Sequence, residues 1–322
     1  MNILNISNLS VEYRRSKKTI HALRDVSVEL QKGETLSIVG ESGCGKSTLA
    51  MAILGLIFKD EGKISEGVIV YSDKNILNSN KNEWQHLRGN EIAIIFQDPF
   101  SSLNPVLKIK EQIIETIDAH KPGITVKDKH QMAVEALKEV MLTDYERILD
   151  SYPHQLSGGQ RQRVVIAMAI INKPKILIAD EPTTALDVTI QKEILELLKK
   201  LKNELSLSVI LITHNIPLAA KNSDRMAVMY AGKIVELGET KSVLNAPLHP
   251  YTQGLFKSIP KLLDPSSSNY ILSGQPPDLS NLPAGCKFWP RCSKVMAVCK
   301  IEEPEEYSVN TSKTRCYLYK EV

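Results

Sequence analysis

The sequence has no long hydrophobic run and no recognisable leader. Its longest uninterrupted apolar stretch, residues 164–171, is far shorter than the roughly 20 apolar residues that a membrane-spanning helix needs. The first residues, MNILNISNLSVEY, contain no basic segment followed by an apolar core, so no signal peptide is expected. We therefore expect a cytosolic chain that reaches a membrane only through a partner, and we do not expect stable disulfides.

The sequence also has little excess charge. A formal net charge of +3 over 322 residues gives no reason to expect a nucleic-acid partner. The composition, 43% hydrophobic and 24% charged, is that of an ordinary globular protein. The length suits one large domain, or one large and one small domain, with ample apolar core.

A glycine-rich loop follows an expected buried strand at residues 34–39. The loop and its flanks, GESGCGKST and then LAMAILGLI, form a complete G-x-x-x-x-G-K-[ST] motif between a strand and a helix. Its backbone N–H groups and the helix dipole suit phosphate oxygens, Lys46 suits the β- and γ-phosphates, and the Ser47 hydroxyl suits Mg²⁺. Cys44 fills a position where a small residue is wanted, so it needs no redox role. The residues expected to contact ATP in this loop are Gly40, Ser42, Gly43, Cys44, Gly45, Lys46, Ser47 and Thr48.

A second expected strand ends in two carboxylates. Residues 175–181, KILIADE, read as a central parallel strand whose carboxyl end lies where α/β sheets bind ligands. Asp180 is expected to hold Mg²⁺ through water, and Glu181 to polarise the attacking water. Without the phosphate loop, a strand ending in solvated acids would be an equal alternative.

The segment LSGGQ at residues 156–160 precedes this acidic strand. Ser157 and Gln160 have the spacing of a helix capping box, and Gly158 and Gly159 open the first turn. The order of these motifs resembles that of ATP-binding-cassette (ABC) ATPases, over residues from about 3 to 240. The resemblance implies a head-to-tail dimer, in which this signature binds the ATP held by the partner's phosphate loop.

The same resemblance implies further site residues. Tyr13 stands where the family stacks an aromatic ring on adenine, and Gln97 where it has a glutamine that contacts the metal. Asp187 belongs to the loop after the acidic strand. His214 matches the switch histidine, although the family usually has aspartate where this chain has Asn215. Glu181, His214 and Gln97 are thus the expected catalytic residues, and Ser47, Gln97 and Asp180 the expected Mg²⁺ contacts.

The family fold implies an α/β cassette at residues 1–245. Its expected parts are a RecA-like nucleotide-binding core, an antiparallel β subdomain within about the first 90 residues, and a helical subdomain at about 100–172. An amphipathic helix is expected at 188–205. A small cysteine-containing segment, residues 246–322, follows, with a Pro/Ser-rich connector at 260–283.

Four local sequences narrow the resemblance to the ATP-hydrolysing subunits of dipeptide, oligopeptide and nickel importers: YPHQLSGGQRQRVVIAMAI, FQDPFSSLNP, LHPYTQGL and GQPPDLSNLPAGCKFWPRC. This resemblance implies that the protein is peripheral and lies on the cytoplasmic face of the membrane. The implied partners are a second, different ATPase subunit, two permeases that dock near Gln97 and Phe100, and indirectly a substrate-binding protein. The resemblance leaves open whether the cargo is a peptide, nickel or a metal-chelate. It also leaves open which ATP site of the pair is the more active one. A non-transport ABC ATPase is less favoured, because no long coiled coil, zinc insertion or second phosphate loop is present.

Four of the five cysteines lie near the end of the chain: Cys286, Cys292, Cys299 and Cys316. They form no tight C-x2–4-C pair of the kind typical of structural zinc. The wide, uneven intervals favour a [4Fe–4S] cluster, and similar segments of the importer family also imply one. Arg291 and Lys287 are expected to offset its negative charge. Zinc and unligated or disulfide-forming cysteines remain alternatives.

Overall fold

The computed structural model describes residues 1–15, 18–58, 60–184, 186–258 and 272–320. The chain forms two compact units: unit 1 contains residues 1–30, 35–77 and 212–322, and unit 2 contains residues 31–34 and 78–211. Within the described ranges, no helix combines the length and the hydrophobicity needed to cross a membrane. Part of the expected connector at 260–283 lies outside the described residues, and residues 272–283 contain no helix or strand.

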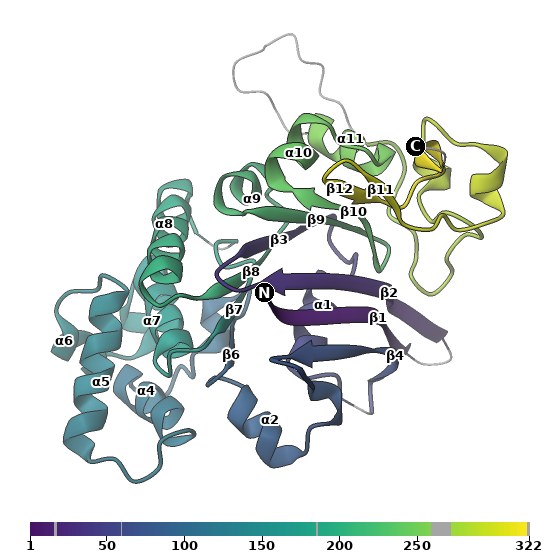
Figure 1. Ribbon diagram of the computed structural model, residues 1–322. Helices are drawn as coiled ribbons and strands as arrows, with labels where there is room; N and C mark the ends of the chain where they lie inside the picture. Colours follow the sequence, from purple (N-terminus) through teal and green to yellow (C-terminus); the bar gives the residue numbers. More distant parts are fainter. Residues whose placement is uncertain (16–17, 59, 185, 259–271, 321–322) are drawn as a thin grey trace. The chain divides into compact units, whose positions relative to one another are not determined.

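Unit 1 contains a four-stranded sheet with the order β2-β1-β4-β5, of which β2, β1 and β4 are labelled in Figure 1. In β1, Leu4 and Ile6 are buried with a spacing of two residues, and the antiparallel register with β4 then shifts at Asn8, where φ is +52°. This irregularity brings Leu9 and Val11 onto the buried face. The bounds are β1 (Asn2–Arg15), β2 (Lys18–Gln31), β4 (Gly62–Tyr71) and β5 (Lys74–Asn75), followed by the short η1 (Ile76–Asn78).

Five further strands of unit 1 lie in the order β11-β12-β10-β9-β3. β3 is buried along its whole length and pairs in parallel with β9, which returns to β10 through Ala231 and Gly232, both at positive φ. The C-terminal hairpin extends this sheet, because β12 pairs with β10. The bounds are β3 (Thr35–Val39), β9 (Arg225–Tyr230), β10 (Lys233–Glu239), β11 (Tyr307–Val309) and β12 (Ser312–Thr314).

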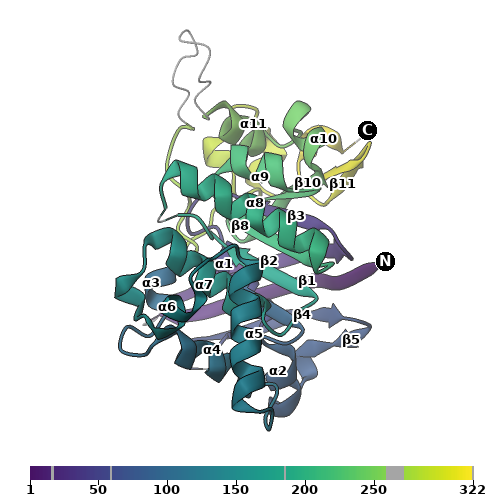
Figure 2. The same ribbon diagram turned by 90° about the vertical axis from the view of Figure 1, so that its left-hand side faces the viewer.

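The helices of unit 1 include α1, which follows the phosphate loop, and α11, whose Tyr251 is fully buried. Tyr251, Tyr230 and Phe288 belong to one hydrophobic cluster, so the cysteine-containing segment packs against the strand and helix that precede it. Figure 2 shows α9, α10 and α11 together with the C-terminal hairpin. The bounds are α1 (Lys46–Ile53), α9 (Ile216–Asn222), α10 (Thr240–Asn245), α11 (Pro250–Lys257), η3 (Trp289–Arg291), η4 (Ala297–Lys300) and η5 (Tyr317–Tyr319).

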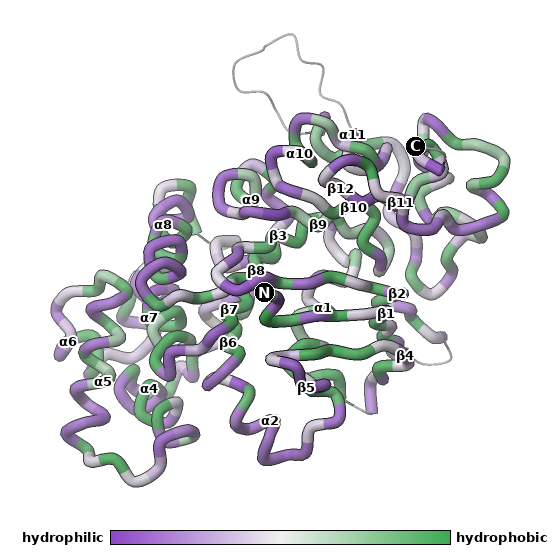
Figure 3. Tube along the Cα trace, in the orientation of Figure 1, coloured by the Kyte–Doolittle hydropathy of each residue, from purple (hydrophilic) through white to green (hydrophobic). Residues whose placement is uncertain are grey.

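Unit 2 contains the strands β8-β7-β6 and most of the helices. β7 is buried throughout and pairs in parallel with β6, and α7 packs against α3, α5 and β6. The expected amphipathic helix is α8, whose hydrophilic and hydrophobic residues alternate along the tube (Figure 3). The strands are β6 (Ile92–Ile95), β7 (Ile176–Asp180) and β8 (Ser208–Thr213), the last of which ends in unit 1. The helices are α2 (Lys81–Leu87), α3 (Pro99–Ser102), α4 (Ile109–Asp118), α5 (Val126–Glu139), α6 (Tyr145–Asp150), η2 (Pro153–Gln155), α7 (Gly158–Ile170) and α8 (Val188–Glu204).

Candidate functional site: a phosphate loop, an acidic strand end and a helix cap

The phosphate loop, residues 40–48, connects β3 to α1 and passes close to other backbone segments. A Cβ atom at Gly40 would lie 2.2 Å from the carbonyl oxygen of Met229, and one at Gly45 would lie 2.5 Å from that of Ala22. Gly45 also precedes α1 with a φ of +108°, a conformation that side chains disfavour. These two glycines are therefore required by close approach within unit 1.

The lysine of this loop is buried, with 5% of its surface exposed. Its Nζ donates hydrogen bonds to the carbonyl oxygens of Gly40 (2.9 Å) and Glu41 (3.0 Å). Lys46 is thus held inside the curl of the loop, while Ser42 and Ser47 are exposed. A lysine cation next to exposed serine hydroxyls at the start of a helix is a donor set that fits a phosphate group.

Two residues of the phosphate loop region have raised pKa values. Burial raises the pKa of the Cys44 thiol, which keeps this cysteine protonated and unreactive at neutral pH. Burial also raises the pKa of Tyr13 in β1, whose side chain forms a hydrogen bond with Thr48. Gly62 in β4 leaves room for the ring, because a Cβ atom there would lie 2.6 Å from Cδ1 of Tyr13. Tyr13 therefore lies beside the start of α1.

The acidic strand end lies in unit 2. The parallel register pairs Ile95 with Ala179, so Gln97 and Glu181 follow neighbouring strand ends. Gln97 Nε2 donates a 2.9 Å hydrogen bond to Glu181 Oε2, and Thr184 Oγ1 donates another of 2.9 Å to the same oxygen.

Two conformational features complete this strand end. Glu181 adopts a φ of +47°, an uncommon conformation that is often found at functional sites. The preceding residue, Asp180, is the last residue of β7 and is buried, with 4% of its surface exposed. The structure thus brings two sequence-predicted residues, Gln97 and Glu181, into contact.

The LSGGQ segment forms the start of α7. Ser157 Oγ accepts a hydrogen bond from the Gln160 backbone N–H (3.2 Å), and Gln160 Oε1 accepts one from the Ser157 N–H (3.0 Å). This reciprocal pair confirms the expected capping box. A Cβ atom at Gly159 would lie 3.1 Å from Cγ2 of Ile190, so the start of α7 packs closely on that of α8.

Two further predicted site residues lie beside helix starts. Asp187 caps α8 by accepting a hydrogen bond from the Ile190 N–H at 3.0 Å. His214 is exposed between β8 and α9, and Asn215 caps α9 by accepting from the Leu218 N–H at 3.1 Å. Asparagine and aspartate are about equally good N-cap residues, which gives the departure at position 215 a physical reason. Ala185 lies outside the described residues.

The prediction of an iron–sulfur cluster or zinc at the C-terminal cysteines is wrong. All five cysteines are free thiols, and nowhere in the described part of the chain do three or more His, Cys, Asp or Glu side chains form a group that could hold a metal ion. The four C-terminal cysteines line one cavity. Burial raises the pKa of Cys286 and Cys316 to about 11 and also raises that of Cys292.

The two cations expected to offset the cluster have other partners. Lys287 Nζ donates to the carbonyl oxygen of Pro283 at 2.9 Å. Arg291 forms two hydrogen bonds with the carboxylate of Glu41 in the phosphate loop, at 2.7 and 2.9 Å. Sequence reasoning missed this link, and it also missed Tyr251 of the LHPY segment, whose hydroxyl accepts a 3.0 Å hydrogen bond from the Glu41 N–H.

Comparisons with known proteins cover nearly all of the chain. The family model described as ABC transporter matches residues 23–184, and the model described as Oligopeptide/dipeptide transporter, C-terminal region, matches residues 235–299. The chain is 44% identical to the Oligopeptide transport ATP-binding protein AppD of Bacillus subtilis, over 99% of this chain and 97% of the relative. It is also 44% identical to the Dipeptide transport ATP-binding protein DppD of the same organism, over 98% and 94%.

A solved structure extends the likeness to the fold. The post-hydrolysis dimer of the ATP-binding cassette MJ0796, bound to ADP and Pi, is 32% identical to this chain with a TM-score of 0.65. The match covers 74% of this chain and 98% of that one. The likeness therefore includes a cassette in a nucleotide-bound state.

Proposed function

The chain belongs to the ABC transporter family and is an ATPase with the cassette fold, as its motifs predicted, and from this premise we propose that it powers the import of dipeptides or oligopeptides. The observation that carries the cargo class is the match of residues 235–299 to the oligopeptide/dipeptide transporter C-terminal region. The names of the most similar relatives support it as well. Nickel or a metal-chelate is not favoured as cargo, because those relatives are named for peptides.

The phosphate loop is proposed to bind ATP with Mg²⁺. Lys46 would hold the β- and γ-phosphates, and the exposed Ser47 hydroxyl would contact the metal ion. Tyr13, beside the start of α1, would stack on adenine. The buried Lys46 and the exposed Ser42 and Ser47 support this assignment. The other proposed loop contacts are Gly40, Ser42, Gly43, Cys44, Gly45 and Thr48.

Hydrolysis is assigned to the acidic strand end and the switch histidine. Glu181 would accept a proton from the attacking water, with its carboxylate oriented by Gln97 and Thr184. Asp180 and Gln97 would contact Mg²⁺. His214 would contact the γ-phosphate region.

The ATP-bound state is proposed to be a dimer with a second, related cassette. Ser157 and the N–H groups of Gly158 and Gly159 would bind the γ-phosphate held by that partner, and Gln160 would keep the cap in place through its bond to Ser157. The dimeric state of the related MJ0796 cassette supports this assembly. Further proposed partners are two permeases, which would hold the chain at the cytoplasmic face of the membrane, and a substrate-binding protein. The proposed domain division stays at residues 1–245 and 246–322.

Replacing the proposed base tests the enzymatic assignment. We expect Glu181→Gln to lower the ATP turnover of the full transporter about 100-fold or more, while ATP binding is kept, because a positioned base contributes about 10²–10⁴ in rate. Glu193→Gln, an equivalent change at a surface ion pair of α8, is the matched control and should leave turnover unchanged.

Uptake in the source cells tests the cargo. Cells that carry the wild-type chain should accumulate a labelled dipeptide or tripeptide, and cells that carry Glu181→Gln should not. Uptake of nickel that depends on Glu181, without uptake of peptide, would overturn the proposed cargo and leave the ATPase assignment intact.

A further inference from the structure

The phosphate loop and the cysteine-containing segment meet at Glu41. Arg291 Nη1 and Nη2 donate to the two carboxylate oxygens of Glu41, a paired geometry that fixes direction as well as distance. Only 4% of the Arg291 side chain is exposed, against 25% of Glu41. The ion pair is therefore largely shielded from water.

Other contacts hold Arg291 in this orientation. Its Nε donates to the carbonyl oxygen of Ser273 at 2.9 Å, and its guanidinium lies 5.8 Å from the ring centroid of Tyr230. Gly274 permits this approach, because a Cβ atom there would lie 3.2 Å from Cγ of Arg291. Contacts with its own segment and with β9 thus hold the guanidinium in place independently of its bonds to Glu41.

The backbone of Glu41 has a second support from α11. The hydroxyl of Tyr251 accepts a hydrogen bond from the Glu41 N–H, and the ring of Tyr251 is fully buried between those of Tyr230 and Phe288. His249 caps α11 by accepting from the Tyr251 N–H at 3.0 Å. In the LHPY segment, Tyr251 therefore contacts the phosphate loop, and His249 holds the backbone of Tyr251.

These contacts converge on the backbone that holds the loop lysine. Lys46 Nζ donates to the carbonyl oxygen of Glu41, the residue whose side chain and N–H are both bound by the C-terminal region. A change in the position of Glu41 moves this carbonyl and the neighbouring N–H groups of the loop.

We propose that Arg291, supported by Tyr251, is a positioning residue for nucleotide binding: through Glu41 it holds the phosphate loop in its phosphate-binding conformation before nucleotide arrives. The proposal rests on the proposed role of this loop. A loop that is already ordered binds its ligand without first losing conformational freedom, and a loop that is competent for only a fraction of the time loses affinity by that fraction.

Arg291→Gln tests the proposal in the full chain. We expect MgADP, measured by calorimetric titration, to bind about tenfold more weakly than to the wild type. Amide hydrogen exchange at residues 40–48 without nucleotide should be faster. Arg291→Lys, which keeps the charge but cannot form the paired bonds, should lie between the two. Tyr251→Phe, which leaves the Glu41 N–H without its acceptor, should change both readouts in the same direction.

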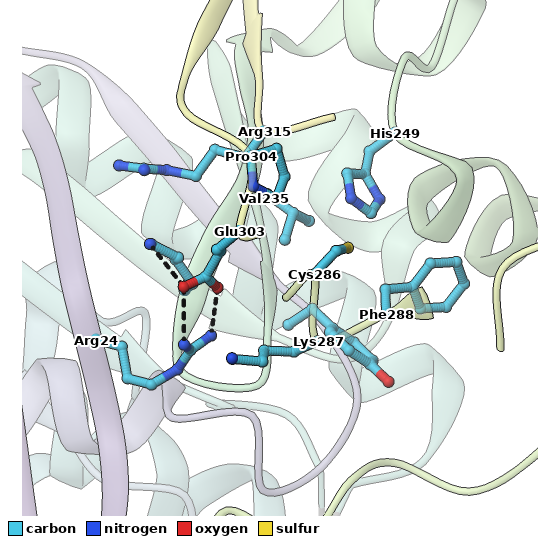
Figure 4. Close-up of a pocket in the computed structure, with 11 residues that line it drawn as sticks. Arg24, Val235, His249, Cys286, Lys287, Phe288, Glu303, Pro304 and Arg315 are labelled. Atoms are coloured by element: carbon cyan, nitrogen blue, oxygen red, sulfur yellow. Dashed lines mark hydrogen bonds and ion pairs between the residues drawn. The ribbon is translucent and has the colours of Figure 1, made fainter. Parts of the chain in front are cut away.

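The same segment offers a matched control at Glu303. This residue forms the other paired bond of the segment, with Arg24 of β2, at 3.0 and 3.2 Å, and Lys233 Nζ lies 3.4 Å away (Figure 4). Glu303→Gln weakens the attachment of the segment without touching the phosphate loop. It should lower the melting temperature and leave MgADP affinity and loop exchange at wild-type values.

Two results would overturn the proposal. One is MgADP affinity of Arg291→Gln within twofold of the wild type, with unchanged exchange at residues 40–48. The other is an equal loss of affinity in Glu303→Gln, which would assign the effect to a general loosening of unit 1. Failure of the wild type to bind MgADP would instead count against the proposed function, and loop exchange would still decide whether Arg291 orders residues 40–48.

Discussion

The phosphate loop and the LSGGQ segment are both glycine-rich turns that lead into a helix, but they are held in different ways. In unit 2, Ser157 and Gln160 cap their own helix, and a Cβ atom added at Gly158 or Gly159 would contact Leu186 or Ile190. In unit 1, the phosphate loop touches residues from β2, β9, α11 and the C-terminal segment. The LSGGQ turn is therefore capped by its own residues and packs on the start of α8, whereas the phosphate loop is held by segments that include residues 210 and 250 positions away.

This difference bears on how each turn responds to substitution. A locally capped helix start loses only its own cap when one residue changes, because the remaining contacts are independent of it. A loop supported from several distant elements shares its contacts with the core, so one change there affects both binding and stability. The predictions below test this distinction, beginning with the largest expected effect.

Gly45→Ala should have the largest effect of the changes considered in this comparison. The new Cβ would lie 2.5 Å from the Ala22 carbonyl oxygen in a backbone conformation of positive φ, so we expect a loss of about 3–5 kcal/mol in the free energy of unfolding. Gly43→Ala is the control, since its φ is also positive but no heavy atom lies within 4 Å of the added Cβ. It should cost about 1–2 kcal/mol. Urea denaturation of both variants measures the two losses in unfolding free energy. Equal losses would contradict the inference that close packing on β2 supports the phosphate loop at Gly45.

His249, which accepts a hydrogen bond from the Tyr251 N–H, should make the stability of the protein sensitive to acid. Burial lowers the pKa of His249 to about 3, from an ordinary value of 6.5. Between these two values the unfolded chain binds a proton that the folded chain does not, so stability falls as the pH falls. The slope from this one group approaches about 1.4 kcal/mol per pH unit, and the loss between about pH 6.5 and about pH 4.5 is about 2 kcal/mol.

His249→Asn isolates this contribution. Asparagine keeps a side-chain acceptor for the Tyr251 N–H but does not titrate. The unfolding free energy of this variant should therefore fall less steeply with decreasing pH, by up to about 1.4 kcal/mol per pH unit, which corresponds to one proton. Burial raises the pKa of Glu236, which accepts hydrogen bonds from the Leu248 and His249 N–H groups. Its contribution is present in both proteins and cancels in the difference. Identical slopes would show that His249 is not held neutral in the folded chain.

Local patterns in the sequence predicted the turns and their flanking elements well. The strand expected at 34–39 is observed as Thr35–Val39, and the helix expected at 188–205 as Val188–Glu204. Both follow from the order of apolar and polar residues along the chain, and the cap of α7 follows from a spacing of three residues. The sequence therefore contains enough information for each turn in isolation.

The sequence could not predict the contacts that join distant segments. Arg291 was expected to balance the charge of thiolates, but it pairs with Glu41, 250 residues away. Cysteine spacing gives the length of the intervening chain, and it does not show how the thiols and the side chains around them are arranged. Both errors arise because pairing across the fold depends on packing, which one sequence does not reveal.

Ser157→Ala should have the smallest effect of the changes considered. It removes the side-chain acceptor of the Gln160 N–H, and loss of an N-cap costs about 1 kcal/mol. The unfolding free energy of the full chain should fall by this amount, while amide exchange at residues 40–48 stays at the wild-type rate. Ser157→Asp retains an acceptor at the cap and should recover most of the stability. Faster exchange in the phosphate loop of Ser157→Ala would break the distinction between the two turns, because it would mean that the cap of α7 supports residues well beyond its own helix.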